Sequence, residues 1–180
     1  MAGTASIYWI SQSAGGACPY DATFSSTTNW TESPAGTWGP TSGNNGEGIQ
    51  SSFSIAGDGY IYATYDGTIN TFNTAIFLTD AESPASPYYG DVPYGLYINS
   101  DENYYRAVNG SYTDLGVAAV SGDLFRVIRT GTTVKAQYFR SGSWTDLHTY
   151  TSGESAALYY GASSADPGWV VKCVNPKYCN

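Results

Sequence analysis

Residues 123–151 read DLFRVIRTGTTVKAQYFRSGSWTDLHTYT, and this stretch decides the fold class. Phe125 and Val127 fall on one side of a strand with a charged residue between them, which is the two-residue period of a half-buried β-strand. Glycine-containing turns at residues 130–132 and 141–143 then reverse the chain twice. The stretch therefore predicts three antiparallel strands joined by tight turns.

The same rhythm of short apolar runs and turn signals extends in both directions. Further strands are expected at residues 6–11, 48–55, 60–65, 74–80, 94–99, 103–108, 112–120, 156–163 and 168–174. The Gly- and Pro-bearing segment at residues 36–48 is expected to be a loop. No helical period of useful length is present. We predict an all-β chain with one domain over residues 1–180, a jelly-roll sandwich of two antiparallel sheets with about 11 to 14 strands. Residues 1–20 and 170–180 are expected as terminal strand or tail segments.

Composition and charge narrow the range of partners. The chain has 17 Tyr, 5 Trp and 6 Phe, and a net charge of −8. Such a charge repels the phosphates of nucleic acid and anionic lipid, so we expect neither as a partner. No apolar run approaches the roughly 20 residues that span a bilayer, so membrane insertion is not expected either. The first ten residues lack the pattern of a secretion signal. We therefore expect either that a signal was removed or that the chain is released from a cytoplasm, and we expect it outside the cell, on a cell surface or on a virion surface.

The three cysteines are Cys18, Cys173 and Cys179. A jelly roll brings its terminal segments together, so Cys18 could pair with either of the other two. A Cys173–Cys179 bond closing a short C-terminal loop is another option, and reduced structural thiols remain a further one. Two glycosylation sequons begin at Asn29 and Asn109.

Two segments resemble the concanavalin A-like lectin/glucanase superfamily, as found in modules of bacterial and viral surface proteins. They are GIQSSFSIAGDGYIYATY at residues 48–65 and YGLYINSDENYYRAVNGSY at residues 94–112, the latter followed by the hairpins of residues 122–144. The resemblance covers roughly residues 24–165 and is one of strands and turns. It implies the two-sheet fold, and glycan or surface binding more weakly, because that fold serves many functions. The closely spaced acidic triplet of the superfamily's hydrolases is absent from the sequence, so we expect no enzyme activity.

Aromatic side chains beside short polar groups are the best functional hint, because sugar rings stack on aromatic faces while Asp and Asn bind hydroxyls. The candidate ligand-binding residues are Tyr88, Tyr89, Tyr94, Tyr97, Tyr105, Trp38, Asp101 and Asn103. Calcium is the only cofactor considered, with Asp101 and Asn103 as ligands or Asp80, Glu82 and Asp91 as a second set; we expect solvated turns instead. His148, the only histidine, is expected to be a polar-face residue without a catalytic role.

Two functions fit these features best. One is a non-catalytic, lectin-like domain that binds a surface or extracellular polysaccharide. The other is a structural subunit of a fibre, appendage or virion surface that assembles through its terminal strands. An enzyme acting on polysaccharide is the third and least favoured.

Overall fold

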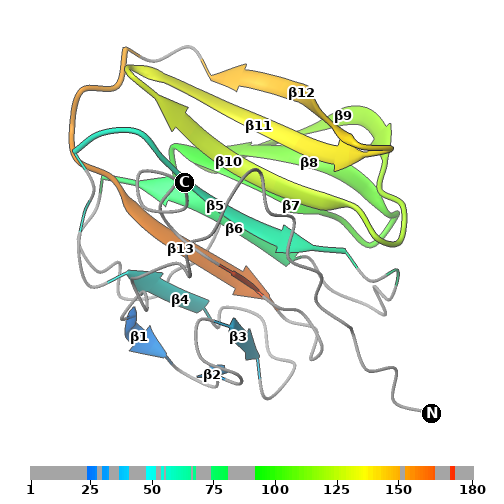
Figure 1. Ribbon diagram of the computed structural model, residues 1–180, viewed down its shortest axis with the longest axis horizontal. Coiled ribbons are helices and arrows are strands. Elements are labelled where there is room, and N and C mark those ends of the chain that lie inside the picture. The colour runs from blue at the N-terminus through cyan, green and yellow to red at the C-terminus, as the bar shows by residue number, and fades with distance from the viewer. Residues whose placement is uncertain are drawn as a thin grey trace.

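A computed structural model describes residues 24–27, 30–32, 37–40, 48–51, 54, 56–65, 67, 74–80, 92–150, 153–164 and 171–172. The described chain forms two antiparallel sheets stacked face to face, which confirms the predicted all-β sandwich (Figure 1). Its fourteen described strands lie within the predicted range. The described residues include no helix with the length and apolar character needed to cross a bilayer.

Each sheet has seven described strands. The first sheet runs, in spatial order, β1 (Phe24–Thr27), β4 (Gly48–Ser51), β13 (Tyr159–Ser164), β6 (Thr74–Thr79), β7 (Tyr94–Ile98), β8 (Asn103–Val108) and β9 (Ser111–Ala118). The second sheet runs β12 (Ser143–Tyr150), β11 (Thr133–Arg140), β10 (Leu124–Thr130), β5 (Gly59–Thr64), β14 (Val171–Lys172), β3 (Thr37–Pro40) and β2 (Trp30–Glu32). Strands from both ends of the sequence thus meet in the second sheet.

Two tight hairpins join β10 to β11 and β11 to β12, as the pattern of residues 123–151 predicted. The β11–β12 turn places Ser141 at φ 55° and Gly142 at φ 86°, a pair of positive φ values that suits the twist of a two-residue hairpin. Across β10 and β11, Val127 pairs with Ala136. Both are fully buried, so the two-residue period identified the inner face of this sheet correctly.

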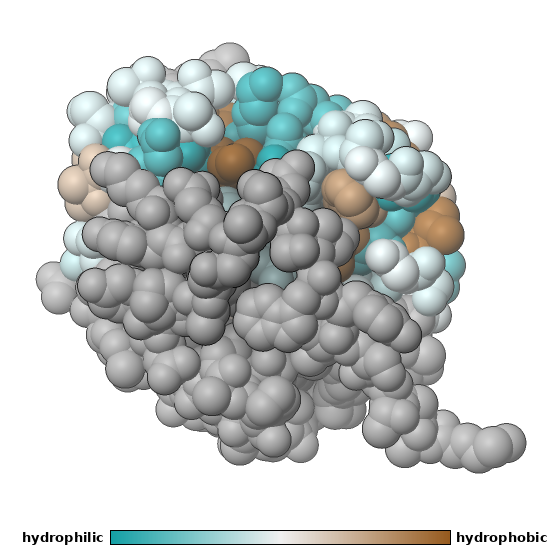
Figure 2. Space-filling view, in the orientation of Figure 1, coloured by the Kyte–Doolittle hydropathy of each residue, from teal (hydrophilic) through white to brown (hydrophobic). Residues whose placement is uncertain are grey.

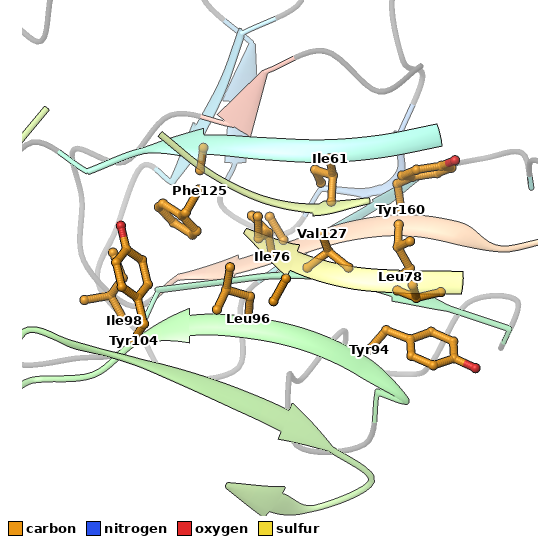
Figure 3. Packing of buried hydrophobic residues seen from close by; sticks show 14 of the residues in the cluster. Ile61, Ile76, Leu78, Tyr94, Leu96, Ile98, Tyr104, Phe125, Val127 and Tyr160 are labelled. Carbon is orange, nitrogen blue, oxygen red and sulfur yellow. The ribbon is translucent and has the colours of Figure 1, made fainter. Parts of the chain in front are cut away.

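The core fills the space between the two sheets (Figure 3). Its largest fully buried side chains are Tyr65, Tyr104, Tyr160, Phe77, Phe125, Ile61, Ile76, Leu78, Leu96, Ile98 and Leu158. The rings of Tyr104 and Phe125, from opposite sheets, lie 6.0 Å apart. Buried tyrosines therefore account for part of the aromatic content, and only the remainder is available to a ligand.

The N-terminal region differs from the prediction. Residues 36–48 were expected as loop, yet they contain β3, while β4 begins at Gly48 where a strand was predicted. In β3, Trp38 pairs with Val171 of β14, a partner more than one hundred residues away in the chain. Local Gly and Pro content predicted a turn, whereas long-range pairing supplies the backbone hydrogen bonds that make the segment a strand.

The C-terminal strand does not lie at a sheet edge. Val171 and Lys172 of β14 pair with β3 on one side and with β5 on the other. Both sets of backbone groups are therefore used within the chain. The prediction that the terminal segment 170–180 joins a second subunit is wrong for these two residues, and residues 1–20 lie outside the described part.

Candidate functional site

Three tyrosines form a cluster on the outer face of the first sheet, which we call the tyrosine face: Tyr97 on β7, Tyr105 on β8 and Tyr112 on β9. The Tyr97 and Tyr105 rings stack with centroids 5.2 Å apart and an interplanar angle of 29°. Tyr112 meets Tyr97 edge-on at 5.6 Å. Tyr97 is only 4% exposed and Tyr112 is 42% exposed, so the outer two rings are the ones that solvent or a ligand reaches.

The register of the strands produces this cluster. Tyr97 lies directly opposite Tyr105 in the β7–β8 pairing, and Tyr112 lies opposite Ala107 in the β8–β9 pairing. Side chains of paired residues project on the same side of a sheet, so the three rings share the outer face. Beneath them, Ala75 and Ala107 complete a small apolar cluster separate from the core.

Short polar side chains surround the exposed end of the cluster. The Tyr105 hydroxyl donates a hydrogen bond to Oδ2 of Asp101 at 2.8 Å, and this bond raises the pKa of Tyr105. The backbone N–H of Asn103 donates to Oδ1 of Asp101 at 3.1 Å. Asp101 therefore stabilises the turn at residues 101–103, as expected for a solvated turn, and it also orients the Tyr105 ring.

The structure brings together four of the predicted ligand residues: Tyr97, Tyr105, Asp101 and Asn103. Tyr94 is different: it opens β7 on the inner face, is 5% exposed, and donates a hydrogen bond from its hydroxyl to Glu154 Oε2 at 2.8 Å (Figure 3). Tyr94 begins the strand predicted at residues 94–99, and its position in the alternation of β7 directs the ring into the core, away from the other candidate ligand residues.

The remaining predicted positions are only partly described. Trp38 lies on β3, and its side chain is outside the description. Asn109 is exposed at a turn with φ 44°, and its glycosylation stays a prediction. The predictions for Tyr88, Tyr89, Asn29, Asp91, Glu82, Cys18, Cys173 and Cys179 lie outside the described residues.

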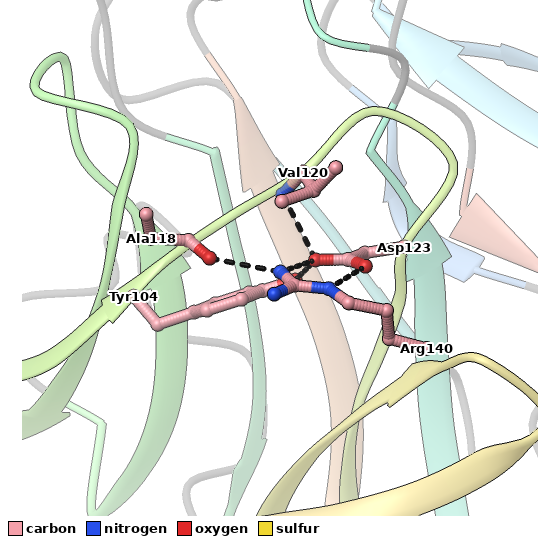
Figure 4. Close-up of polar contacts among 5 residues, drawn as sticks. All are labelled: Tyr104, Ala118, Val120, Asp123 and Arg140. Atoms are coloured by element: carbon pink, nitrogen blue, oxygen red, sulfur yellow. Dashed lines mark hydrogen bonds and ion pairs between the residues drawn. The ribbon is translucent and has the colours of Figure 1, made fainter.

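A buried carboxylate lies where the β9–β10 connection meets β8 and β11 (Figure 4). Burial alone would raise the pKa of Asp123, but hydrogen bonds from Arg140, the Val120 N–H and the Tyr104 hydroxyl outweigh it and hold that pKa below its ordinary value. Every donor belongs to the protein, so this network fixes the loop and is not a vacant site. The sequence pattern did not predict this network, because its members belong to different strands and connections.

His148 connects the two sheets. Its Nε2 lies 3.3 Å from Nη1 of Arg106, which belongs to β8 of the opposite sheet, and its ring meets Tyr150 edge-on at 4.9 Å. Burial and then the charge of Arg106 lower the pKa of His148. The expected polar-face residue is therefore a half-buried contact between sheets.

Among the residues that the structure describes, no group of three or more His, Cys, Asp or Glu side chains is arranged to hold a metal ion. Asp101, the carboxylate of the first calcium set, already accepts hydrogen bonds from Asn103 and Tyr105. Asp80 is exposed at the end of β6.

A second polar and aromatic cluster lies on the outer face of the second sheet, around Arg126 on β10 and Trp144 on β12. The alternation in residues 123–151 predicts Arg126 on the side opposite Phe125 and Val127, but no contact of Arg126 with other strands was predicted from it. The two-residue turns offered a usable signal, because counting back from them places Arg126 opposite Gln137 and Phe139 opposite Trp144.

The comparisons with known proteins identify the fold. No protein-family model matches the sequence, and no curated protein matches it. Among solved structures, the TRIM65 PSpry domain aligns over 85% of this chain and 91% of its own, with 15% identity and a TM-score of 0.60. A legume lectin-like domain from Entamoeba histolytica aligns over 78% and 83%, with 11% identity and a TM-score of 0.54. Stonustoxin aligns over 83% of this chain at 11% identity and a TM-score of 0.60, but the match spans only 28% of that longer protein.

These matches show that the chain has the concanavalin A-like sandwich fold, as the resemblance implied. At such low identities the likeness extends to the fold alone. The matched structures include a lectin-like domain and a SPRY-type domain, so the fold by itself does not specify the ligand.

Proposed function

We propose that this protein is a non-catalytic carbohydrate-binding domain, exposed outside a cell or on a virion, that holds a glycan on its tyrosine face. The observation that carries the proposal is the stacked pair of Tyr97 and Tyr105, with the outer ring fixed by Asp101. A sugar ring offers C–H groups to an aromatic face and hydroxyls to carboxylates and amides at its rim. The tyrosine face offers both kinds of contact within one patch.

Preorganisation supports this assignment. The stack and the hydrogen bond to Asp101 hold the Tyr105 ring in place before any ligand arrives, so little side-chain entropy is lost on binding. Tyr112 borders the stack and is the more exposed ring. On the face of the molecule that Figure 2 shows, the described residues are mostly pale or hydrophilic and the apolar ones form small separate patches, which suits a polar ligand better than a broad apolar partner.

Self-assembly through sheet edges is less well supported. Strands β9 and β12 end their sheets on the same side of the sandwich, and both pairings that hold them contain a register shift. On β9, Gly116 has φ 68° and donates its N–H to Asp114 Oδ1. Irregular, charged edges of this kind hinder pairing with another strand. The fibre or virion-subunit alternative would therefore need a different contact surface.

The test is a glycan array followed by calorimetric titration of any glycan that binds. Tyr105→Ala and Tyr112→Ala are expected to weaken binding about tenfold or more. Tyr105→Phe retains the ring and is expected to lose less affinity for the glycan. Tyr159→Ala is the matched control, because it removes a half-buried tyrosine from β13 of the same sheet. Unchanged binding in both alanine variants would reject the tyrosine face. Release of reducing sugar from a polysaccharide panel would reject the non-catalytic assignment, and stable multimers in light scattering without glycan binding would favour assembly.

A further inference from the structure

The outer face of the second sheet carries an arrangement that we call the arginine platform. It consists of Tyr60 on β5, Arg126 on β10, Lys135 and Gln137 on β11, and Trp144 and Asp146 on β12. The Arg126 guanidinium carbon lies 3.7 Å from the centroid of the Trp144 ring and 5.5 Å from that of Tyr60. Two aromatic rings from strands on either side therefore hold one cation between them.

A chain of hydrogen bonds also holds the polar side chains of the platform in position. Arg126 Nε donates to Gln137 Oε1 at 2.7 Å, and Gln137 Nε2 donates to Asp146 Oδ1. Asp146 Oδ2 in turn accepts from Lys135 Nζ at 2.6 Å. Each acceptor orients the next donor, so the guanidinium has a defined position on the sheet.

Among the described residues Arg126 makes no direct ion pair; Asp146 acts on its charge at longer range, beyond Gln137. Its only described side-chain hydrogen bond uses Nε, which leaves the two Nη groups without a described acceptor. Arg140, by contrast, is bound to Asp123, and Arg129 donates to three backbone carbonyls. Burial lowers the pKa of Arg126 to about 10, the direction expected for a half-buried cation without an ion-pair partner.

The platform carries a local positive charge on an acidic protein. Arg126 and Lys135 contribute two positive charges and Asp146 one negative, a net charge of +1, while the whole chain has −8. An extended polyanion would be repelled by the whole protein. A short sugar with one or a few carboxylates is repelled far less than a long polyanion, and its carboxylate still meets the local positive charge.

We propose that the arginine platform binds a carboxylate-bearing sugar, with the carboxylate on the Arg126 Nη groups and the ring against the neighbouring tyrosines. Guanidinium and carboxylate match as a planar two-point pair. Tyr62 lies opposite Arg126 in the β5–β10 register, and its ring centroid is 5.9 Å from that of Tyr60, so aromatic surface lies beside the anion position. The inference rests on the proposed function only in taking glycans as the ligand class, since it concerns the opposite sheet.

The experiment titrates a galacturonate trimer, its methyl-esterified form and inorganic sulfate into the wild-type protein and the Arg126→Gln and Arg126→Lys variants. The trimer is expected to bind the wild type and to lose about tenfold or more in affinity in Arg126→Gln. Arg126→Lys is expected to lose most of that affinity as well, because an ammonium cannot form the two-point pair. Methyl esterification should weaken binding to the same degree, and raised salt should weaken the trimer alone. Tyr159→Ala again serves as the control that leaves binding unchanged.

Equal affinity for the trimer and its methyl ester, or an unchanged affinity in Arg126→Gln, would overturn the proposal. Sulfate binding as tightly as the trimer would mean a simple anion site and would overturn the sugar assignment. Should the variants fail to fold, the indole N–H signal of Trp144 in the wild-type NMR spectrum must still shift on adding the trimer; no shift overturns the inference. Neutral-glycan binding in Tyr105→Ala is measured in parallel, so that failure of the tyrosine face and failure of the arginine platform are observed separately.

Discussion

Arg140 binds the Asp123 carboxylate at two points, from Nε to Oδ1 at 2.8 Å and from Nη2 to Oδ2 at 2.6 Å. The carboxylate side chain is 1% exposed and the arginine side chain 34% exposed. A second bond from Arg140 Nη2 reaches the Ala118 carbonyl at 2.8 Å (Figure 4). The pair thus ties the end of β11 to the connection between β9 and β10.

Removing the arginine should destabilise the fold more than removing an exposed cation. Arg140→Gln leaves Asp123 buried with only the Tyr104 hydroxyl and the Val120 N–H as donors. We expect a loss of about 2 kcal/mol in the free energy of unfolding, below the usual cost of breaking a buried pair because solvent reaches the arginine. Urea denaturation measures it. Lys135→Gln, which removes an exposed ion pair, should lose less than about 1 kcal/mol; equal losses would contradict the structural role of the pair.

Stability should depend on pH through His148. The folded pKa of His148 lies below its ordinary value of 6.5, so the unfolded chain takes up the proton first as the pH falls. Stability from this group is therefore complete above about pH 6.5 and declines below it until the folded-state pKa is passed. His148→Gln should flatten this part of a stability-against-pH curve measured by urea denaturation. Because the chain has one histidine, a slope that persists in the variant would have to come from another group.

Gly142 should be needed for its backbone conformation alone. It adopts φ 86°, and a Cβ added there would meet no atom within 4 Å. Gly142→Ala is therefore expected to cost about 1 kcal/mol through the positive φ, without any steric contribution. Gly153 is the control, because it also has open space around it but no positive φ; Gly153→Ala should be neutral or slightly stabilising. Thermal melting of both variants measures the difference in stability. Similar melting temperatures would contradict a requirement for glycine at the positive φ of Gly142.

Gly59 should be needed for space. A Cβ at this position would overlap the hydroxyl of Tyr160, a fully buried core residue. Gly59→Ala is expected to cost about 2 kcal/mol through overpacking. Tyr160→Phe removes the obstructing oxygen, so the double variant should recover much of the loss in a double-mutant cycle. Additive losses would show that the two residues do not compete for the same volume.

The alternation in residues 123–151 was sufficient to predict β10, β11 and β12 and the inner face at Phe125 and Val127, because two-residue turns fix the register of the strands that they join. Tyr97, Tyr105, Asp101 and Asn103 were named from the sequence as candidate ligand residues, and they meet in the structure because they belong to consecutive strands joined by a short turn. The sequence pattern did not identify Tyr94 as a buried ring, because in the run of residues 94–98 it does not show which side of the strand faces the core.

The sequence by itself determined the fold class, the hairpins and the acidic, aromatic character of the chain, since these depend on local period, turn chemistry and composition. Only the tertiary structure decided that β14 lies between β3 and β5, that Asp123 receives Arg140, and that Arg126 is held between Trp144 and Tyr60. The β14 pairings and the contact of Tyr60 with Arg126 join strands that become neighbours only through long-range pairing, so no local pattern encodes them. The Arg140 and Trp144 contacts lie within consecutive hairpins, where register brings the residues near one another but side-chain packing decides which groups meet.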